Sequence, residues 1–255
     1  MMALVSLENV SKTYGAFAAL TDVSLEVDSG EVVCVLGDNG AGKSTLIKIL
    51  AGLHQPTSGT IYIDSKPAQL ASPADALEAG IATVYQDLAV VGQMSVWRNF
   101  FLGQERVGRF GILRRAEMRR ITQEQLSSMG IDIPDVEVPI ASLSGGQRQV
   151  VAIARAIFFG ARVVILDEPT AALGVKQSGM VLRFIAKARD QGTAVILITH
   201  NPHHAHLVGD RFTVLNLGKQ VLYATKSEIS VDELALQMAG GGELDTLQHE
   251  LGRNK

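Results

Sequence analysis

The sequence of 255 residues has few of the features that cross-link a chain or anchor it in a membrane. Its single cysteine, Cys34, excludes an internal disulfide and lies in an apolar run, where we expect a small buried side chain rather than a reactive thiol. No apolar run approaches the roughly 18 residues of a membrane span, and Met1 to Ser6 carry no secretory signal. The formal net charge of −3 argues against broad nucleic-acid binding. A soluble cytosolic protein without a nucleic-acid partner is therefore expected.

The clearest pattern in the chain lies between Gly37 and Thr45. It reads G-D-N-G-A-G-K-S-T, after an apolar run at 32–36 and before a segment with helical spacing. Between a strand and a helix, G-x-x-x-x-G-K-[ST] is a phosphate-binding loop, because its glycines let backbone N–H groups surround an anion. Lys43 is expected to reach the β- and γ-phosphates of a nucleoside triphosphate, and Ser44 to bind Mg²⁺. A glycine-rich turn before an ordinary helix is the alternative, which the complete pattern disfavours. The residues predicted to bind the nucleotide here are Gly37, Asp38, Asn39, Gly40, Ala41, Gly42, Lys43, Ser44 and Thr45.

The order of the apolar segments predicts an α/β fold. Alternating segments at 4–10 and 23–27, with a turn at 11–15 between them, suit antiparallel strands. Apolar runs at 163–166 and 194–198 flank a helical stretch at 175–190, which implies parallel strands joined by a right-handed crossover. We expect a P-loop NTPase core with a mostly parallel sheet and an N-terminal antiparallel β subdomain. Further strands are predicted at 60–63 and 81–85, helices at 73–80 and 231–238, and a hairpin at 211–225 that turns at Gly218-Lys219.

The composition changes at about residue 93. From there to about residue 130 the spacing looks helical, and six arginines lie between Arg106 and Arg120. We interpret residues 93–160 as a helical subdomain inserted into a core of about 1–92 and 161–239, and residues 240–255 as a mobile polar tail. The arginines could contact nucleic acid or lipid head groups, but the glutamates between them favour a solvated face or a contact with a partner subunit.

Two acidic residues, Asp167 and Glu168, follow the apolar run at 163–166. A carboxylate at the tip of a buried parallel strand faces the crevice where ligands bind. Asp167 is expected to hold the Mg²⁺ that Ser44 also binds, and Glu168 to polarise the attacking water as a general base. An acidic turn after a core strand is the alternative, which the phosphate-binding loop upstream disfavours.

A second pattern begins at Leu143 and reads L-S-G-G-Q-R-Q. Ser144 supplies a capping hydroxyl, and Gly145 and Gly146 leave the backbone N–H groups unhindered, so residues up to Gln147 form a second helix start suited to an anion. Two such starts in one chain suggest a nucleotide that is held from two sides. The alternative, a capped amphipathic helix, would need the serine but not the Gly-Gly-Gln.

Leu143 to Gln147 match the full signature of the ATP-binding subunits of ABC transporters, and the chain resembles this family over about residues 4–225. The resemblance implies that the signature contacts the γ-phosphate held by the loop of a second subunit, across a dimer interface. It also implies that Tyr14 stacks on adenine and that His200 contacts the γ-phosphate. Gln86 is expected to approach Mg²⁺ and the water, near the membrane partner.

One position departs from the family pattern. After Glu168-Pro169-Thr170 the family usually continues with a loop that ends in Leu-Asp, and here Gly174 stands at the aspartate position, which puts the coupling of the two sites in doubt. The segments 172–176, 84–88 and 99–103 resemble the branch that imports simple sugars. Many members of that branch carry two ATPase halves, whereas this sequence has one, so a second copy is expected, most simply of itself.

The resemblance implies an ATPase that drives an importer. The expected partners are integral-membrane permease subunits, a second ATPase subunit in a homodimer, and a periplasmic or extracellular solute-binding protein. The expected location is peripheral, at the cytoplasmic face of the inner membrane. ATP and Mg²⁺ are the implied cofactors, with Lys43, Gln86, Glu168 and His200 in catalysis and Ser44, Gln86 and Asp167 at the metal.

Three alternatives remain at this point. The first is a soluble ABC-type ATPase that acts in DNA repair, on chromosomes or on ribosomes. Such ATPases usually carry a coiled-coil or zinc insertion, or two ATPase halves with a basic linker, and this sequence shows none of these features. A nucleotide-gated switch that hydrolyses poorly is supported by Gly174 and opposed by intact Asp167, Glu168 and His200. Zinc binding by the histidines at 200, 203, 204 and 206 lacks a cysteine or carboxylate at matching spacing.

Overall fold

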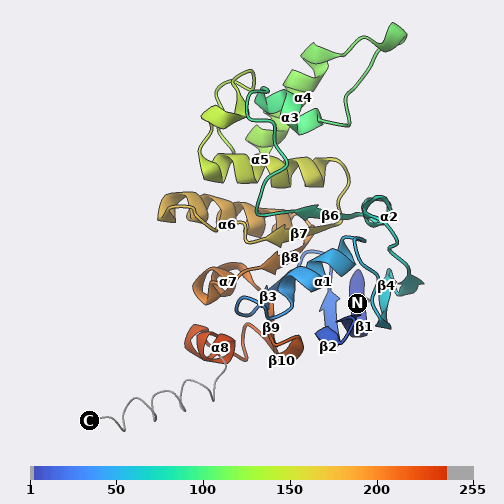
Figure 1. The fold of residues 1–255 in the computed structure, drawn as a ribbon. Helices are drawn as coiled ribbons and strands as arrows, with labels where there is room; N and C mark the ends of the chain where they lie inside the picture. Colours follow the sequence, from blue (N-terminus) through green and yellow to red (C-terminus); the bar gives the residue numbers. More distant parts are fainter. Residues whose placement is uncertain (1–2, 240–255) are drawn as a thin grey trace.

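Residues 3–239, which this computed structural model describes, form one ten-stranded sheet with helices on both faces (Figure 1). The strand order is β5-β4-β1-β2-β10-β9-β3-β8-β7-β6, which confirms the α/β class. The tail predicted for 240–255 lies outside the described residues. The strands are β1 (Val5–Tyr14), β2 (Phe17–Val27), β3 (Val32–Leu36), β4 (Ser58–Ile63), β5 (Lys66–Ala68), β6 (Ile81–Val84), β7 (Val163–Asp167), β8 (Ala194–Ile198), β9 (Arg211–Asn216) and β10 (Lys219–Thr225). The helices are α1 (Lys43–Leu50), α2 (Pro73–Glu78), α3 (Val96–Phe101), α4 (Arg115–Ser128), α5 (Gly145–Phe158), α6 (Val175–Asp190), α7 (Pro202–Val208) and α8 (Val231–Met238).

One half of the sheet is parallel and contains the predicted core strands. β3, β8, β7 and β6 lie side by side in that order, and all three pairings between them are parallel. The predicted crossover is confirmed, because α6 connects β7 to its neighbour β8. The carboxyl ends of parallel strands meet at one edge of a sheet, so the loops that follow these four strands come together there.

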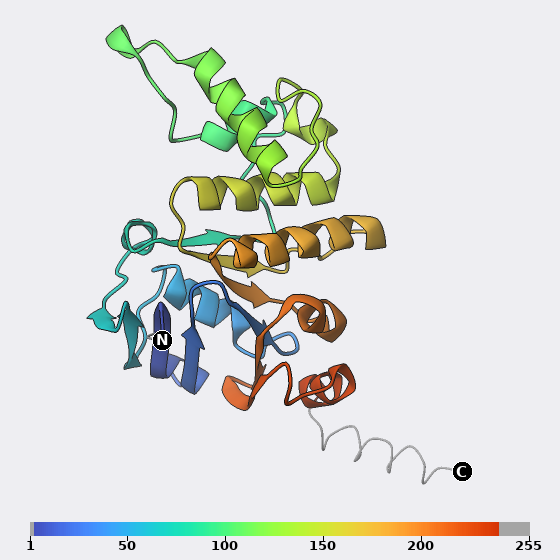
Figure 2. The same cartoon turned by 180° about the vertical axis from the view of Figure 1, so that it is seen from behind.

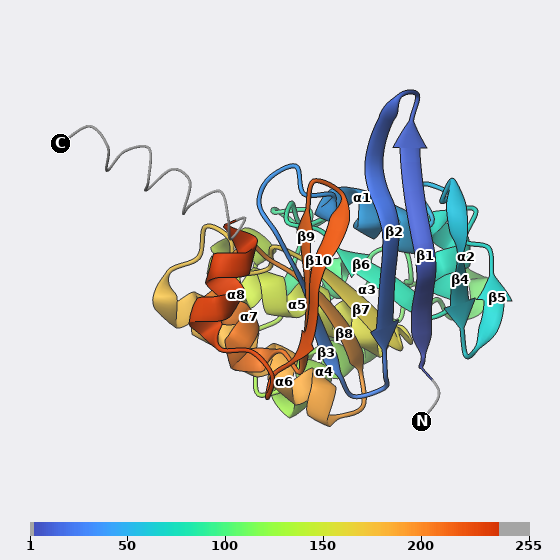
Figure 3. The same cartoon turned by 90° about the horizontal axis from the view of Figure 1, so that it is seen from below.

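The other half is antiparallel and begins with a hairpin longer than the sequence suggested. Tyr14 pairs with Phe17, so the turn is only two residues long and the turn predicted at 11–15 is mostly strand. Three register shifts between Leu7 and Thr13 break the alternation of buried and exposed side chains, which explains why the pattern did not reveal the full strand. Figure 3 shows this hairpin projecting beside β10, to which it is joined by a single parallel bridge between Thr21 and Lys219.

The predicted C-terminal hairpin, β9–β10, turns one residue earlier than expected. Lys219 is already the first residue of β10, and Leu217 and Gly218 both have positive φ (46° and 79°). A two-residue turn with two positive φ angles matches the right-handed twist of the flanking strands. The twist therefore selects Leu217-Gly218 as the turn, although leucine is not a typical residue there.

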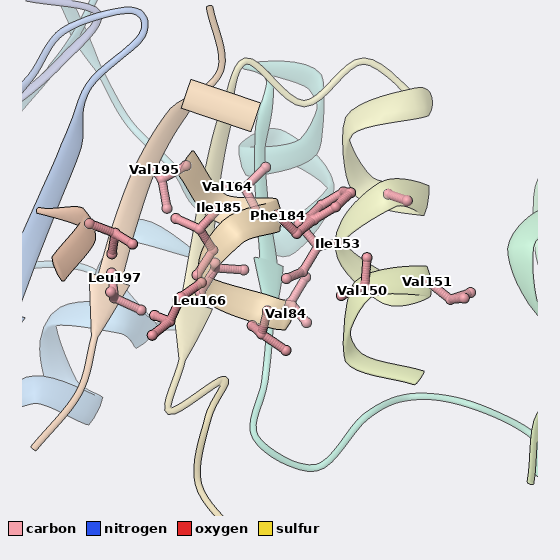
Figure 4. Close-up of a cluster of buried hydrophobic side chains, with 14 of the residues drawn as sticks. Val84, Val150, Val151, Ile153, Val164, Leu166, Phe184, Ile185, Val195 and Leu197 are labelled. Carbon is pink, nitrogen blue, oxygen red and sulfur yellow. The ribbon is translucent and has the colours of Figure 1, made fainter. Parts of the chain in front are cut away.

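Hydrophobic side chains fill both faces of the sheet. Along β3, Val33 and Val35 belong to the cluster that contains the α1 side chains, whereas Cys34 belongs to the cluster with α5 and α6. Figure 4 shows the second cluster, where Phe184 of α6 and Ile153 of α5 lie over the strands. Cys34 is fully buried, and burial raises the pKa of its thiol well above the usual range, as expected of an inert core residue.

The segment between β6 and β7 is helical only in part. Between α3 and α4 the chain forms an extended hairpin in which Val107 bridges Leu113, so the prediction of helical spacing throughout 93–130 is wrong there. At the tip, Arg109–Gly111 form only a single 3₁₀ turn, in which Phe110 has the positive φ of 67° and prevents a longer helix. Figure 2 shows the hairpin projecting from one end of the molecule and α5 lying along α6. Because α5 packs on α6 as well as on α3 and α4, the limits of the helical subdomain stay a prediction.

Two helices of the core begin at a serine that caps the helix. At α2 the Ser72 hydroxyl accepts from Asp75 N–H and the Asp75 carboxylate accepts from Ser72 N–H, and Pro73 is the first helical residue. Ser230 and Glu233 form the same reciprocal pair at α8. None of the helices within residues 3–239 has both the length and the apolar character that a membrane span requires.

Candidate functional site

Four loops carry predicted site residues to the carboxyl edge of the parallel strands. The phosphate-binding loop follows β3, Glu168 follows β7, His200 follows β8 after Thr199, and Gln86 follows β6 two residues beyond its end. The sheet order β3-β8-β7-β6 makes these loops neighbours, although more than 100 residues separate the first from the last along the sequence. The structure thus places the catalytic candidates on one edge of the sheet, where a hydrogen bond joins Glu168 to His200 and the Glu168 carboxylate acts on Lys43. No hydrogen bond or ion pair within residues 3–239 joins Gln86 to these three.

Lys43 is the most buried charged residue of this edge, with only 9% of its surface exposed. Its Nζ donates to Gly37 O (2.6 Å) and Asp38 O (2.9 Å), so the loop curls around the ammonium group. Burial lowers the pKa of Lys43, and the carboxylates of Glu168, Asp38 and Asp167 oppose that shift. An anion that reaches this loop therefore meets a positive charge held inside the ring of backbone groups.

Two glycines of the loop are required by close contacts. Gly37 has φ +147°, and a Cβ there would lie 2.3 Å from Leu215 O. Gly42 has φ +106°, and a Cβ there would lie 2.7 Å from Leu20 Cδ2. Gly42 is also the N-cap of α1 and has no side chain to cap the helix, so the first N–H groups of α1 remain available to a phosphate.

The two carboxylates at the end of β7, Asp167 in its last position and Glu168 directly after it, differ in environment. Burial raises the pKa of Asp167, the neighbouring Glu168 carboxylate adds to the rise, and Lys43 opposes it. Glu168 has φ 47°, an uncommon value for a residue with a side chain, and its N–H donates to Ile198 O (2.9 Å). Such a strained backbone persists only where the surroundings hold it, and it turns the Glu168 side chain toward the segment after β8.

That segment holds both oxygens of the Glu168 carboxylate. His200 Nδ1 lies 2.8 Å from Oε1, and because a carboxylate accepts only, Nδ1 carries the proton of this hydrogen bond. The Thr199 hydroxyl donates to Oε2 (3.2 Å). The His200 contact joins two residues that the sequence proposed for catalysis, whereas Thr199 was not among the predicted residues.

The residues proposed for Mg²⁺ fit that ion by their chemistry. Asp167 supplies a carboxylate, Ser44 an exposed hydroxyl at the start of α1, and Gln86 an exposed amide oxygen. Mg²⁺ takes oxygen ligands and usually one or two carboxylates together with phosphates and waters. Asp167 and Glu168 place two neighbouring carboxylates at this edge, where a cation would offset their repulsion.

Tyr14 is the last residue of β1. β1 pairs with β2, and β2 contacts α1, the helix that follows the phosphate-binding loop. Its ring is 42% exposed and meets His54 edge-on, with a centroid distance of 5.6 Å. Lys12 Nζ lies 5.2 Å from the ring centroid. The exposed ring leaves aromatic surface for a base, which is consistent with the proposed role in adenine stacking.

The second helix start is built differently from the first. The Ser144 hydroxyl accepts from Gln147 N–H (3.3 Å) and Gln147 Oε1 accepts from Ser144 N–H (3.0 Å), a complete capping box. A Cβ at Gly145 would lie 2.6 Å from Leu173 Cδ2, so this glycine allows α5 to approach the loop before α6. In Figure 1, α6 and the parallel strands separate α5 from α1, so the two starts lie in different layers of this chain.

Two further observations concern residues near the site. The Thr170 hydroxyl, which the sequence did not single out, hydrogen-bonds His204 Nδ1 (3.0 Å) and so ties the loop before α6 to α7. Burial lowers the pKa of His204, and His203 and His200 add to the shift. The imidazoles of His200, His204 and His206 thus bond to three separate partners, Glu168, Thr170 and Ile229 O, rather than to a common point.

Similarity to known proteins points to the same nucleotide-binding function as the geometry of the site. Residues 20–171 match the family model described as ABC transporter. The chain is 42% identical to the xylose/arabinose import ATP-binding protein of Sulfolobus acidocaldarius (92% of this chain, 93% of that protein) and 40% identical to the fructose import ATP-binding protein of Rhizobium meliloti (94% and 95%). It is 38% identical to the ribose import ATP-binding protein of Yersinia pestis but spans about half of that longer protein (46%).

Solved structures show the same fold. The protein cbiO1 of Clostridium perfringens, part of the ABC transporter complex cbiONQ, superposes with a TM-score of 0.78 at 27% identity, over 99% of this chain and 100% of that one. A dimeric ATP-binding cassette in a post-hydrolysis state with ADP and phosphate superposes with a TM-score of 0.72 at 29% identity, over 87% and 98%. With a family match across the phosphate-binding loop and the signature, and the catalytic loops assembled at one sheet edge, the chain belongs to the ATP-binding, ATP-hydrolysing subunits of ABC transporters.

Proposed function

We propose that this chain powers the import of a simple sugar by hydrolysing ATP on a permease in the membrane. The observation that carries the proposal is the similarity, over more than nine-tenths of both chains, to two ATP-binding proteins named for pentose and fructose import. The substrate itself would pass through the permease, so no residue of this chain identifies the sugar. A homodimer, a solute-binding protein and a peripheral place at the cytoplasmic face of the membrane belong to the same proposal.

The proposal assigns a role to each site residue, and the positions of these residues support it. Lys43 and the N–H groups of the loop hold the phosphates, with Tyr14 at the base. The signature, Ser144 to Gln147, closes over the nucleotide of a second subunit. When bound through Ser44, Asp167 and Gln86, Mg²⁺ supplies charge that offsets the phosphate oxygens.

In the hydrolytic step Glu168 acts as general base. The oxygen of a water molecule forms a bond to the γ-phosphorus, the bond from that phosphorus to the bridging oxygen breaks, and Glu168 takes a proton from the water. The products are ADP and inorganic phosphate. His200, whose side chain is 62% exposed, can leave the Glu168 carboxylate and contact the γ-phosphate.

The test is the steady-state ATPase rate against protein concentration, for the wild-type chain and for Glu168→Gln. We expect a rate that rises faster than linearly with concentration, because each site needs the signature of a second subunit. The substitution should lower turnover at least about a hundredfold while ATP still binds, since general bases contribute about 10²–10⁴-fold. A wild-type chain that binds ATP but never hydrolyses it would favour the nucleotide-gated switch or a strict need for the permease, and adding the permease separates those two.

A further inference from the structure

The Thr199 hydroxyl is a buried polar group beside the carboxylate of Glu168. Thr199 directly follows β8 and is only 1% exposed, and its hydroxyl makes two hydrogen bonds. Its Oγ1 lies 3.2 Å from Glu168 Oε2 and 3.1 Å from the backbone nitrogen of Asn201. A buried hydroxyl placed between a backbone group and a carboxylate raises the question of which way its proton points.

The partners of Thr199 fix the direction of its proton. The Asn201 N–H can only donate, so the hydroxyl oxygen accepts from it. A threonine hydroxyl carries one proton, and that proton is therefore free to be donated to Glu168 Oε2. Hydrogen bonds to a carboxylate are stronger than neutral ones, so this arrangement holds one oxygen of Glu168 at a defined place.

The end of β8 holds the backbone of Glu168 as well as its side chain. Ile198 O accepts from Glu168 N–H (2.9 Å), and the next residue, Thr199, donates to the Glu168 carboxylate. Glu168 has φ 47°, which needs such support. Two consecutive residues of one buried strand end thus determine where the Glu168 carboxylate lies.

The two groups that hold the carboxylate differ in exposure. Thr199 is buried, whereas the His200 side chain is 62% exposed and bonds the other oxygen, Oε1. A histidine that turns toward a γ-phosphate gives up Oε1, whereas the buried hydroxyl donates to Oε2 and to no other acceptor within residues 3–239. During that movement only Thr199 keeps the carboxylate oriented.

We propose that Thr199 is the positioning residue of Glu168, holding Oε2 so that Oε1 faces the attacking water once His200 has moved to the phosphate. This inference rests on the proposed role of Glu168 as general base. It predicts that the Thr199 hydroxyl contributes to turnover and not to ATP binding, because its hydrogen-bond partners are Glu168 and Asn201 and not the loop proposed to hold the phosphates.

The experiment compares Thr199→Val, Thr199→Ser and Thr213→Val in the ATPase assay, on the chain alone or, if the chain alone is inactive, on the reconstituted transporter. Thr213 is the matched control, since it is fully buried and its hydroxyl has no partner among the described residues. We expect Thr199→Val to lower kcat about ten- to a hundredfold, as misplaced catalytic groups do, with KM for ATP and the affinity for a non-hydrolysable ATP analogue within about twofold. Thr199→Ser, which restores the hydroxyl, should stay within about threefold of wild type, and Thr213→Val should match wild type.

A double-variant cycle with Glu168→Gln separates the two proposals. If Thr199 acts through Glu168, Thr199→Val adds no further loss in the Glu168→Gln background. A full additional loss there, an equal loss in Thr199→Ser, or a loss confined to KM would overturn the positioning role. If instead Glu168→Gln alone turns over like wild type, the proposed general base is wrong whatever Thr199 does. Thermal unfolding of each variant shows whether Thr199→Val has merely weakened the fold. In that case Thr199→Ala against Thr199→Ser decides, because both lack the methyl group and only the second keeps the hydroxyl, so equal kcat in these two would overturn the proposal.

Discussion

The starts of α1 and α5 solve the same problem of unpaired backbone N–H groups in opposite ways. At α1 the N-cap is Gly42, which has no side chain, and Lys43 is held on the carbonyls of the loop. At α5 the N-cap is Ser144, whose side chain and that of Gln147 satisfy each other's backbone N–H groups. The first start is open and positively charged, and the second is closed on itself.

This difference indicates which start can hold a phosphate by itself. An open helix start with a buried ammonium group binds an anion without displacing anything. A capped start offers fewer free N–H groups, and it becomes useful to a nucleotide only when another element already holds the phosphates. The arrangement is consistent with a signature that acts on the nucleotide of a second subunit.

Among the substitutions that test this comparison of the α1 and α5 starts, Gly42→Ala is expected to change stability most. Gly42→Ala places a Cβ 2.7 Å from Leu20 Cδ2 and 2.9 Å from Ala19 O at φ +106°. We expect a loss of about 2–4 kcal/mol of unfolding free energy, from the unfavourable φ and from overpacking together. The control is Gly40→Ala, at φ +82° with nothing within 4 Å, where only about 1 kcal/mol should be lost. Chemical denaturation measures both, and equal losses would show that the close contact at Gly42 does not matter.

Lys43→Ala should break the open start as a binding site. Removing a charged hydrogen-bond donor to the phosphates costs about 1.5–3 kcal/mol, which corresponds to an ATP affinity about ten- to a hundredfold weaker. Lys48→Ala, an exposed residue of the last turn of the same helix, is the matched control and should bind ATP normally. Calorimetric titration with ATP gives both constants. Normal affinity in Lys43→Ala would mean that the backbone N–H groups alone hold the phosphates.

Ser144→Ala removes the cap of the closed start. We expect about 1 kcal/mol less stability, as is usual for loss of a serine N-cap, and unchanged ATP affinity of the single subunit. Ser230→Ala breaks the same kind of capping box at α8, which lies at the other end of the molecule from α5 in Figure 1, and should cost a similar amount. Turnover at high protein concentration distinguishes them, because only Ser144→Ala should lower it. A fall in ATP affinity of dilute Ser144→Ala would contradict the assignment of this start to a second subunit.

The smallest effect concerns Gly174, the N-cap of α6. Its backbone is extended (φ −69°, ψ 162°), and a Cβ would meet nothing within 4 Å, so space does not exclude the aspartate usual in the family. Gly174→Asp should stabilise the protein by a few tenths of a kcal/mol through a new helix cap, whereas Gly174→Ala should not. Thermal unfolding of the pair gives the answer, and destabilisation by aspartate would point to a contact that the single chain does not show.

Local patterns in the sequence were sufficient for the elements that carry most of the site. Three elements depend only on neighbouring residues and were each predicted within a residue or two. They are the strand, glycine-rich loop and helix at 32–50, the carboxylates at the end of β7, and the capped helix start at Ser144. The length of β1 and the hairpin at 104–114 were not predicted from the sequence. Register shifts hid the first, and the second depends on Phe110 and Gly111 adopting positive φ, which spacing does not reveal.

The sequence by itself determined that this chain is an ATP-binding subunit with a phosphate-binding loop after β3, and it predicted a base, a metal ligand and a histidine beside that loop. Only the tertiary structure decided how these groups meet. Thr199 and Glu168 are 31 residues apart and lie on two strand ends that become neighbours only when β7 and β8 pair. Contacts of this kind depend on sheet order and on the burial of single hydroxyls, and a one-dimensional pattern of residue types contains neither.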